Sequence, residues 1–298
     1  MTHLLTFTAS THDISTSHMS AAEHFLNKFN LTIAGNTKWL SENRALQYEI
    51  NQAPSKAQLD EMRVHFAIDE IDILIVAKDR AHKKLLIADM DSTIVTGETL
   101  DEMASAAGLQ EQIAAITTRA MNGELDFSAA LTQRVKMLAG QSESILSSHL
   151  PHMQLSSGAK EFIKTMNANG ATCVLVSGGF TFFTGYIAKE VGFNHHHGNV
   201  LEINNGLLTG KVIPPILDKD AKYEFLKLYI EELELDIEDT LTIGDGANDL
   251  VMLEAAGLGI GYHPKQLLKD RLDNLIVFGD LTAALYAQGY SDKDIING

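Results

Sequence analysis

The first 80 residues combine two kinds of apolar spacing, which together predict a small mixed domain. Apolar residues three to four apart indicate amphipathic helices, and short apolar or alternating runs indicate strands. In chain order the predicted elements are a strand at 4–9, a helix at 21–29, strands at 32–40 and 44–50, a helix at 55–67 and a strand at 72–77. The order βαββαβ is that of a ferredoxin-like α+β domain, which we expect over residues 1–80.

From residue 84 onward, mostly apolar runs of four or five residues alternate with helical segments. Such runs are typical of strands buried on both faces of a parallel sheet. The predicted strands are 85–88, 172–176, 240–243, 258–262 and 275–278, and helices are expected at 159–169, 182–191, 221–233 and 249–256. This alternation predicts an α/β fold with a doubly wound, Rossmann-like parallel sheet over residues 84–298. Residues 78–83 are charged, and we expect them to form a linker that few contacts cross.

Two segments depart from this alternation. Residues from about 98 to 152 have helical spacing throughout, which predicts a helical insert between the first two strands of the sheet. Thr99 and Glu102 fit a capping box at the beginning of this insert. Residues 200–212 flank Asn204-Asn205-Gly206, which is a β-hairpin signal.

The composition is that of a well-cored chain with an excess of negative charge. Of the 298 residues 45% are apolar, and the formal net charge is −16, with an isoelectric point near 5.1. This charge argues against nucleic acid or an anionic membrane as a partner, and it leaves small anionic substrates possible where local cations or a metal receive them. No apolar run reaches the roughly 18 residues of a membrane span, and the N-terminus lacks the basic region of a signal peptide. Because Cys173 is the single cysteine, we expect a cytoplasmic protein without disulfides.

Polar clusters follow three of the predicted strands. Asp89 and Asp91 follow the first, Ser177-Gly178-Gly179 the second, and the acidic segment 244–249 the third. The carboxyl ends of parallel strands meet at one edge of a sheet, so these clusters are expected to converge. Paired carboxylates call for a cation or a proton between them, and a glycine-rich turn lets backbone N–H groups approach an anion. Each cluster alone is also compatible with a simple turn or helix cap. Lys222 adds a cation at a helix start, where the helix dipole disfavours one.

Together these motifs resemble the haloacid dehalogenase-like phosphohydrolases, and among them the phosphoserine phosphatases. The similarity covers about residues 84–290 and rests on DMDST at 89–93, VSGGF at 176–180, Lys222 and GDGAND at 244–249. It implies hydrolysis of phosphoserine to serine and phosphate through an aspartyl-phosphate. By position, Asp89 corresponds to the nucleophile and Asp91 to the general acid and base.

The resemblance also implies a Mg²⁺ cofactor and a phosphate site. It assigns the metal to Asp89, the Asp91 carbonyl and Asp245, with Asp249 orienting them, and the phosphoryl group to Ser177, Gly178, Lys222 and Asn248. Lys219 is a competing cation, but the alanine-lysine ending of the family motif favours Lys222.

In the same way, the helical insert resembles the family's cap, which selects the substrate. Glu98 corresponds to the carboxylate that receives the substrate ammonium, Arg134 to the cation that receives its carboxylate, and Met121 and Phe127 to residues that line the pocket. At about 100° per residue, Arg134 falls roughly 20° from Phe127 on one helix face. Without the family match, a guanidinium at the edge of an apolar stripe could equally reach out to solvent.

The N-terminal domain resembles the ACT-type domains that precede some metabolic enzymes. Its first strand-to-helix turn, residues 10–17, lacks the glycine that commonly lets a ligand approach the backbone. We therefore expect this domain to serve packing or the formation of a homodimer.

Several alternatives stay open from the sequence. They are a phosphatase for another small phosphomonoester, a phosphotransferase, a phospho-accepting signalling domain and a non-catalytic amino-acid sensor. Two further patterns are assigned to surface structure. The histidines at 195–197 are expected in a turn before the hairpin, and the acidic run at 231–239 on a solvated face.

Overall fold

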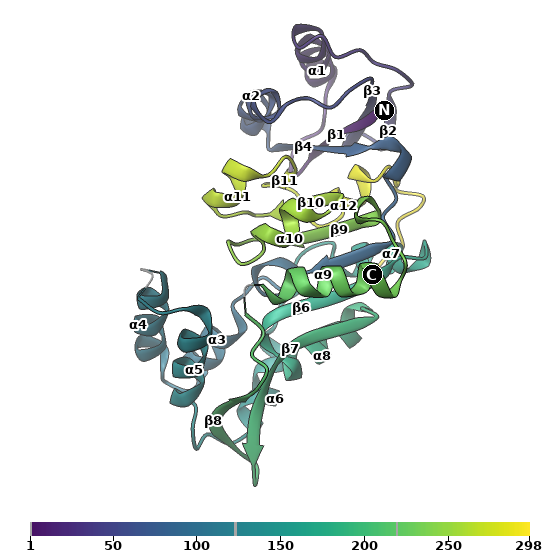
Figure 1. The fold of residues 1–298 in the computed structure, drawn as a ribbon. Helices are drawn as coiled ribbons and strands as arrows, with labels where there is room; N and C mark the ends of the chain where they lie inside the picture. The colour runs from purple at the N-terminus through teal and green to yellow at the C-terminus, as the bar shows by residue number, and fades with distance from the viewer. Residues whose placement is uncertain (1, 122–123, 219) are drawn as a thin grey trace.

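The computed structural model describes residues 2–121, 124–218 and 220–298, except for the side chains of residues 106, 120 and 121. It contains a four-stranded and a seven-stranded sheet, and the smaller one forms the N-terminal end of the molecule (Figure 1). Among the described residues, no helix is both long and apolar enough to cross a membrane.

The N-terminal sheet is antiparallel and has the strand order β2-β3-β1-β4. Its elements are β1 (His3–Ala9), α1 (Thr16–Lys28), β2 (Lys38–Ser41), β3 (Ala45–Ile50), α2 (Lys56–Phe66) and β4 (Ile71–Ala77). The two helices pack on one face through a core that includes Phe7, Tyr48 and Phe66. The predicted ferredoxin-like order is therefore confirmed, although β2 is shorter than expected.

The larger sheet has the strand order β11-β10-β9-β5-β6-β7-β8. Its strands are β5 (Leu85–Ala88), β6 (Thr172–Phe180), β7 (His195–Asn204), β8 (Leu207–Ile213), β9 (Thr240–Gly244), β10 (Leu258–Tyr262) and β11 (Leu275–Ile276). All neighbours are parallel except β7 and β8. The predicted parallel sheet is confirmed, and the hairpin extends it by two strands.

The histidines at 195–197 were expected in a turn, and this expectation is wrong. They begin β7 and pair with Val174 to Val176 of β6. His196 shares a hydrogen bond of 2.9 Å with the Thr184 hydroxyl, and His197 one of 2.8 Å with the Tyr229 hydroxyl. Partners on neighbouring helices thus accommodate polar rings in a strand that the local pattern does not predict.

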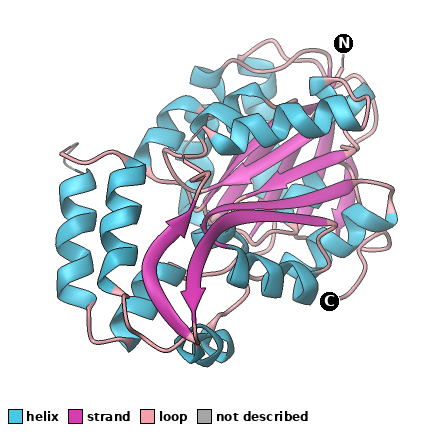
Figure 2. Ribbon diagram, turned by 60° about the horizontal axis from the view of Figure 1, so that its bottom comes forward, coloured by secondary structure: helices cyan, strands magenta, loops and turns pink. Residues whose placement is uncertain are grey.

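Helices cover both faces of the larger sheet (Figure 2). They are α7 (Ala159–Ala168), α8 (Thr181–Val191), α9 (Ala221–Glu232), α10 (Leu250–Ala255), α11 (Gln266–Arg271) and α12 (Ala283–Ala287). Because successive side chains of a strand point to opposite faces, Leu86 and Ala88 join the core under α7, α8 and α12. Leu85 and Ile87 join the core under α9, α10 and α11. The central strand β5 is thereby fixed from both sides.

The insert is the group of helices at the side of the sheet in Figure 1, and we call it the cap. It comprises α3 (Thr99–Ala106), α4 (Gln110–Met121), α5 (Phe127–Met137) and α6 (Ser144–His149). Two short extended segments join it to the sheet, with the Thr96 N–H donating to the Gln154 carbonyl at 2.9 Å. The β7–β8 hairpin reaches out to it (Figure 2), and the Gly140 N–H donates to the Leu208 carbonyl at 2.8 Å.

The capping box expected at the start of the cap does not form. Glu98 is the N-cap residue of α3, and its side chain makes no capping hydrogen bond. Thr99 is engaged with Asp91, and Glu102 lies 3.3 Å from the His149 ring. Long-range partners thus replace the local hydrogen bonds that the sequence pattern favours.

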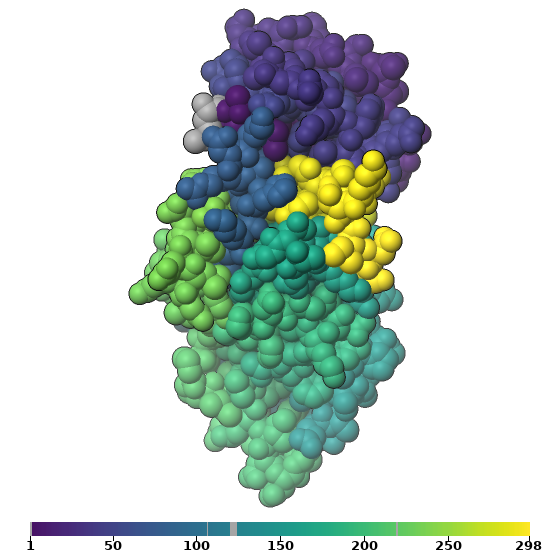
Figure 3. Space-filling view, turned by 90° about the vertical axis from the view of Figure 1, so that its right-hand side faces the viewer, coloured from purple at the N-terminus to yellow at the C-terminus, as the bar shows by residue number. Residues whose placement is uncertain are grey.

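The N-terminal sheet packs against the C-terminal part of the chain (Figure 3), so the expectation of a sparsely contacted linker is wrong. The Asp72 carboxylate in β4 accepts the backbone N–H groups of Val277, Phe278 and Gly279 at 2.8 to 3.3 Å. Within the linker, Arg80 pairs with Asp239 at 2.9 Å. Asp239 is only 4% exposed, so the acidic run is not wholly solvated.

Candidate active site

Asp89 lies directly after β5, where the strand passes into a tight turn over residues 90–94. It is buried, and its Oδ1 accepts the backbone N–H of Met90 at 2.7 Å. Ser92 has a φ of 54°, in the left-handed region that few non-glycine residues adopt. The turn therefore ends the strand abruptly and leaves the Asp89 carboxylate at the carboxyl edge of the sheet.

Asp91 stands two residues further on and has different partners. Its Oδ1 accepts the Thr99 N–H at 2.9 Å and also the Thr99 hydroxyl, while its Oδ2 accepts the Ser177 hydroxyl at 3.0 Å. Asp91 is thus held between the start of the cap and the end of β6. The two carboxylates of one strand end are separated, so they can take different chemical roles.

The loop at the end of β6 is tightly enclosed. The Ser177 hydroxyl accepts the Gly179 N–H at 2.8 Å. A Cβ at Gly178 would lie 2.7 Å from Cζ of Phe127 in the cap, and one at Gly179 would lie 3.3 Å from Oδ2 of Asp91. A side chain at Gly178 would require the Phe127 ring to move. One at Gly179 would require a smaller shift of Ser177 or Asp91, so glycine suits both positions.

Asn199 of β7 secures this loop and was not predicted from the sequence. It is fully buried. Its Nδ2 donates to the Gly178 carbonyl at 2.8 Å, and its Oδ1 accepts the Leu217 N–H at 2.8 Å. It thereby ties the loop to the segment that leads into α9. A polar residue between a glycine and an apolar strand segment is the signal that could have indicated it.

A buried acidic cluster, comprising Asp89, Asp245 and Asp249, lies beside this loop. One carboxylate oxygen of each lies within 4.8 Å of the others. Lys222 at the start of α9 is 3% exposed, and its Nζ lies 2.7 Å from Asp89 and 2.5 Å from Asp249. Lys265, which was not predicted, lies 3.0 Å from Asp245. It follows β10, and its place after a strand end could have indicated it.

The cluster fits a divalent cation. Burial and the Asp249 carboxylate raise the pKa of Asp89, and Lys222 only partly offsets this effect. Burial opposes the charge of Lys222, but the Asp249 and Asp89 carboxylates outweigh burial and raise its pKa. Two lysines therefore face these three carboxylates and the nearby Asp91. Carboxylate oxygens are the ligands that hard divalent cations prefer, and such a cation would relieve their mutual repulsion.

The cap brings two oppositely charged side chains to the same region. Glu98 accepts the Ser92 hydroxyl at 2.9 Å, and burial together with the Asp91 charge raises its pKa. Burial lowers the pKa of Arg134, although the charges of Asp101 and Glu98 oppose this shift. In the described part of the chain, Arg134 Nε is buried without a hydrogen-bond partner. A ligand that carries both charges could satisfy both groups.

The structure says little about three residues that the sequence analysis named, which are Asn248, Met121 and Lys219. Asn248 is exposed, and its Oδ1 would lie 2.7 Å from a Cβ at Gly246. The Met121 side chain and Lys219 lie outside the described residues.

The carboxylates lie at the ends of the neighbouring strands β9 and β5, and the glycine loop lies at the end of β6, on the other side of β5. Together with the helical cap, this arrangement defines a Rossmann-like α/β protein with a capped candidate active site. The chain belongs to the haloacid dehalogenase-like hydrolases, whose family profile matches residues 86–254.

Known proteins resemble the chain over different lengths. A phosphoserine phosphatase of Archaeoglobus fulgidus is 39% identical over 194 residues, which are 65% of this chain and 56% of that relative. The match thus spans little more than half of the relative's length.

Two solved structures extend the comparison. A HAD-family hydrolase of Salmonella enterica serovar Typhi is 28% identical and superposes with a TM-score of 0.86, covering 98% of this chain and 99% of that one. A phospho-aspartyl intermediate analogue of a phosphoserine phosphatase is 36% identical with a TM-score of 0.64, covering 68% of this chain and 98% of that one. The first comparison includes the N-terminal sheet as well as the site.

Proposed function

We propose that this protein hydrolyses O-phospho-L-serine to L-serine and inorganic phosphate, the reaction that completes serine biosynthesis. One observation carries the proposal: Asp89 belongs to the acidic cluster, whereas Asp91 is held outside it by Thr99 and Ser177. The names of the relatives support the same reaction.

In this mechanism the two aspartates act in sequence. Asp89 attacks phosphorus and forms an aspartyl-phosphate, while Asp91 gives its proton to the departing serine oxygen. Asp91 then removes a proton from water as the water attacks phosphorus, which releases phosphate and restores the Asp89 carboxylate. The two hydrogen bonds from Thr99 keep Asp91 in position for both proton transfers, so that the Ser177 hydroxyl is free to turn to the phosphoryl group.

We assign the phosphoryl oxygens to Ser177, the Gly178 N–H, Lys222 and Asn248. Lys222 supports this role best, because a buried ammonium beside the attacking carboxylate offsets charge that develops on the phosphoryl group. Asn199 positions the loop without touching the substrate.

We further propose Mg²⁺ as the cation, held by Asp89, the Asp91 carbonyl and Asp245, with Asp249 orienting them. Bound there, Mg²⁺ would neutralise negative charge on the phosphoryl oxygens. The proximity of the three carboxylates supports this assignment.

For substrate selection we assign Glu98 to the serine ammonium and Arg134 to its carboxylate, with Phe127 and Met121 lining the space between. The opposite charges of Glu98 and Arg134, and the Arg134 Nε that lacks a partner among the described residues, support this assignment, because phosphoserine supplies the opposite charge for each.

The remaining proposals concern organisation. We propose an ACT-like domain over residues 1–80 and a catalytic domain over 84–298, with the cap at about 98–152. We also propose a cytoplasmic homodimer. The homodimer is supported by β2, which is an edge strand of the N-terminal sheet and carries the 41% exposed Trp39. The unpaired backbone groups of such an edge could pair with a strand of a second copy of the chain.

The test is the release of phosphate and of the parent alcohol from a matched set of phosphate esters, with Mg²⁺ and after its removal by a chelator. O-phospho-L-serine should be preferred over phosphoethanolamine, which lacks the carboxylate, and over 3-phosphohydroxypropionate, which lacks the ammonium. Hydrolysis gives equal serine and phosphate, whereas transfer to an added alcohol gives more serine than phosphate. Equal rates on all three esters would contradict the assigned selectivity.

A further inference from the structure

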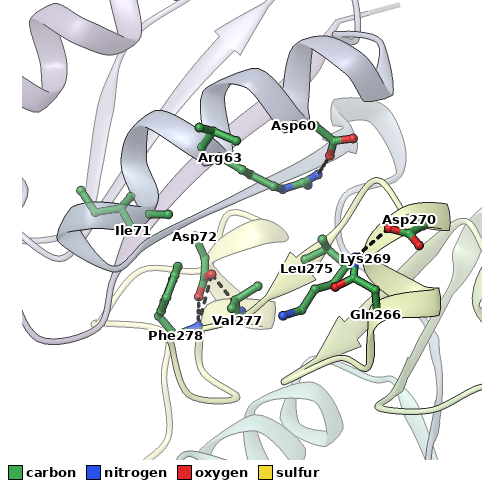
Figure 4. Close-up of a pocket in the computed structure, with 12 residues that line it drawn as sticks. Asp60, Arg63, Ile71, Asp72, Gln266, Lys269, Asp270, Leu275, Val277 and Phe278 are labelled. Atoms are coloured by element: carbon green, nitrogen blue, oxygen red, sulfur yellow. Dashed lines mark hydrogen bonds and ion pairs between the residues drawn. The ribbon is translucent and has the colours of Figure 1, made fainter.

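The seam between the N-terminal sheet and the catalytic sheet contains a cavity of about 480 Å³ (Figure 4). Residues of α2 and β4 form one wall, and residues of α11 and the segment after β11 form the other. Val64, Val277 and Phe278 contribute apolar surface. The cavity is remote from the acidic cluster in sequence and has the size and mixed polarity of small-molecule sites, which are common at domain interfaces.

Two cationic side chains of this cavity have unused donors. Arg63 donates to the Asp60 carboxylate at 3.0 Å, to the Ile73 carbonyl at 3.2 Å and to the Asp273 carbonyl, yet its Nε is buried without a partner among the described residues. Lys269 on α11 is half-buried, and no hydrogen bond or ion pair engages its ammonium within the described chain. Figure 4 shows its side chain extending across the cavity toward Val277.

The carboxylates that line the same cavity already have partners. Asp60 accepts Lys56 Nζ at 2.8 Å as well as Arg63, and Asp72 accepts three backbone N–H groups. Asp270 accepts the Gln266 amide at 2.7 Å. What the lining lacks is therefore a hydrogen-bond acceptor beside Lys269 and Arg63. A group with two negative charges would be repelled by Asp60 and Asp270, so a single charge fits better.

We propose that this cavity binds a small amphipathic carboxylate. Its carboxylate group pairs with Lys269 beside Arg63, and its apolar body packs against Val64, Val277 and Phe278. The site differs from the proposed catalytic site in both its residues and its apolar character.

A short helix connects this site to the acidic cluster. Lys265 immediately precedes α11, donates its N–H to the Asp245 carbonyl at 3.0 Å and places its Nζ 3.0 Å from the Asp245 carboxylate. The Lys269 N–H donates to the Lys265 carbonyl at 3.3 Å, one helical turn away. A ligand that pairs with Lys269 thus contacts the helix that follows Lys265, the residue that holds Asp245, which makes the cavity suited to regulation of catalysis.

The test is binding of 4-phenylbutyrate to the full chain, followed through backbone amide signals in NMR spectra with phosphate and Mg²⁺ present. The amide signals of Val277 and Phe278 should shift, and neutral 4-phenylbutanamide should bind more weakly. Lys269→Met should weaken binding about 10-fold or more, as expected for loss of a charge-assisted pair. Lys269→Arg should retain binding, and Lys189→Met on the exposed part of α8 serves as the matched control.

A second pair of variants tests the position of the charge without touching Lys269. Val64 is 80% exposed at the cavity, so Val64→Glu and Val64→Lys should both fold. The first should weaken and the second strengthen binding of the carboxylate. Shifts confined to the cap, equal binding of the amide, or equal effects of Lys269→Met and Lys189→Met would overturn the proposal. Because binding is read without turnover, a failure of phosphoserine hydrolysis would leave this result intact.

Discussion

At the scale of single residues, the aspartates at the end of β5 differ in the groups that hold them. Asp89 contacts Lys222 within the acidic cluster, whereas Asp91 is bound by Thr99 and Ser177. Substitutions at the two positions should therefore have different consequences.

Asp89→Asn should abolish phosphate release, because an amide is neither a competent nucleophile nor a good metal ligand. Asp91→Asn should reduce the rate by about 10²–10⁴-fold, the usual contribution of general acid–base catalysis. Steady-state phosphate release measures both, with the exposed Asp79→Asn as control. Near-normal turnover by either variant would exclude the proposed roles.

Arg134→Ala should harm phosphoserine hydrolysis far more than phosphoethanolamine hydrolysis, because only phosphoserine carries a carboxylate. Loss of a charge-assisted hydrogen bond costs about 1.5–3 kcal/mol, or roughly 10- to 150-fold in kcat/KM. Lys136→Ala, at an exposed position on the same helix, serves as the control and should leave kcat/KM almost unchanged for both esters. If Arg134→Ala lowers both rates alike, the guanidinium supports the cap and does not select the substrate.

The sequence predicts most of the site because strand-end motifs carry it. Asp89, Ser177 and Asp245 each follow an apolar run, and parallel topology brings such ends together. Asn199 and Lys265 escaped prediction for the opposite reason. Asn199 acts on Gly178 and Leu217 through contacts made only after folding, and nothing local to it specifies those partners.

At the scale of elements, α5 of the cap meets the loop after β6 through Phe127 and Gly178. The 2.7 Å approach of the Phe127 ring to a Cβ at Gly178 leaves no room for a side chain. The position of the cap over the loop thus depends on one glycine.

Gly178→Ala should displace the cap and lower kcat/KM for phosphoserine, with a penalty of about 1–3 kcal/mol typical of overpacking. In a Phe127→Ala background the same change should cost much less, because the clash is gone. Kinetics of the two single variants and the double variant measure this coupling. Additive losses would mean that the loop itself, and not its contact with the cap, requires glycine.

The order and type of most elements could be predicted, but their local details could not. Ser55 caps α2 as a local pattern predicts, accepting the Gln58 N–H at 3.4 Å. Thr99 fits a similar pattern and yet donates to Asp91, because this half-buried carboxylate competes for its hydroxyl. Local patterns fail where a distant partner offers a better hydrogen bond.

At the scale of the whole molecule, the seam between the two sheets is the main departure from expectation. The charged segment 78–83 suggested independent units, but Asp72 binds three backbone N–H groups more than 200 residues away. A local sequence pattern around Asp72 cannot predict hydrogen bonds to residues so far away in the chain.

Asp72→Ala should lower the free energy of unfolding by about 1–3 kcal/mol, because it leaves buried N–H groups unpaired. Urea unfolding of the full chain measures this loss, with Asp79→Ala as the exposed control. A chain beginning near residue 78 should be less stable still, since it lacks β4 altogether. A truncated chain as stable and active as the full one would show that the seam is dispensable.

The pairing of Asp72 with Val277 also has a consequence for biosynthesis. The two residues are 205 positions apart, and ribosomes add about 5–20 residues per second. Once β4 has been made, roughly 10–40 s must pass before the residues that cover it emerge. During that interval the nascent N-terminal unit exposes the edge of its sheet, a template for wrong pairing with other chains. The edge at β4 is therefore covered only by residues that are made about 200 positions later.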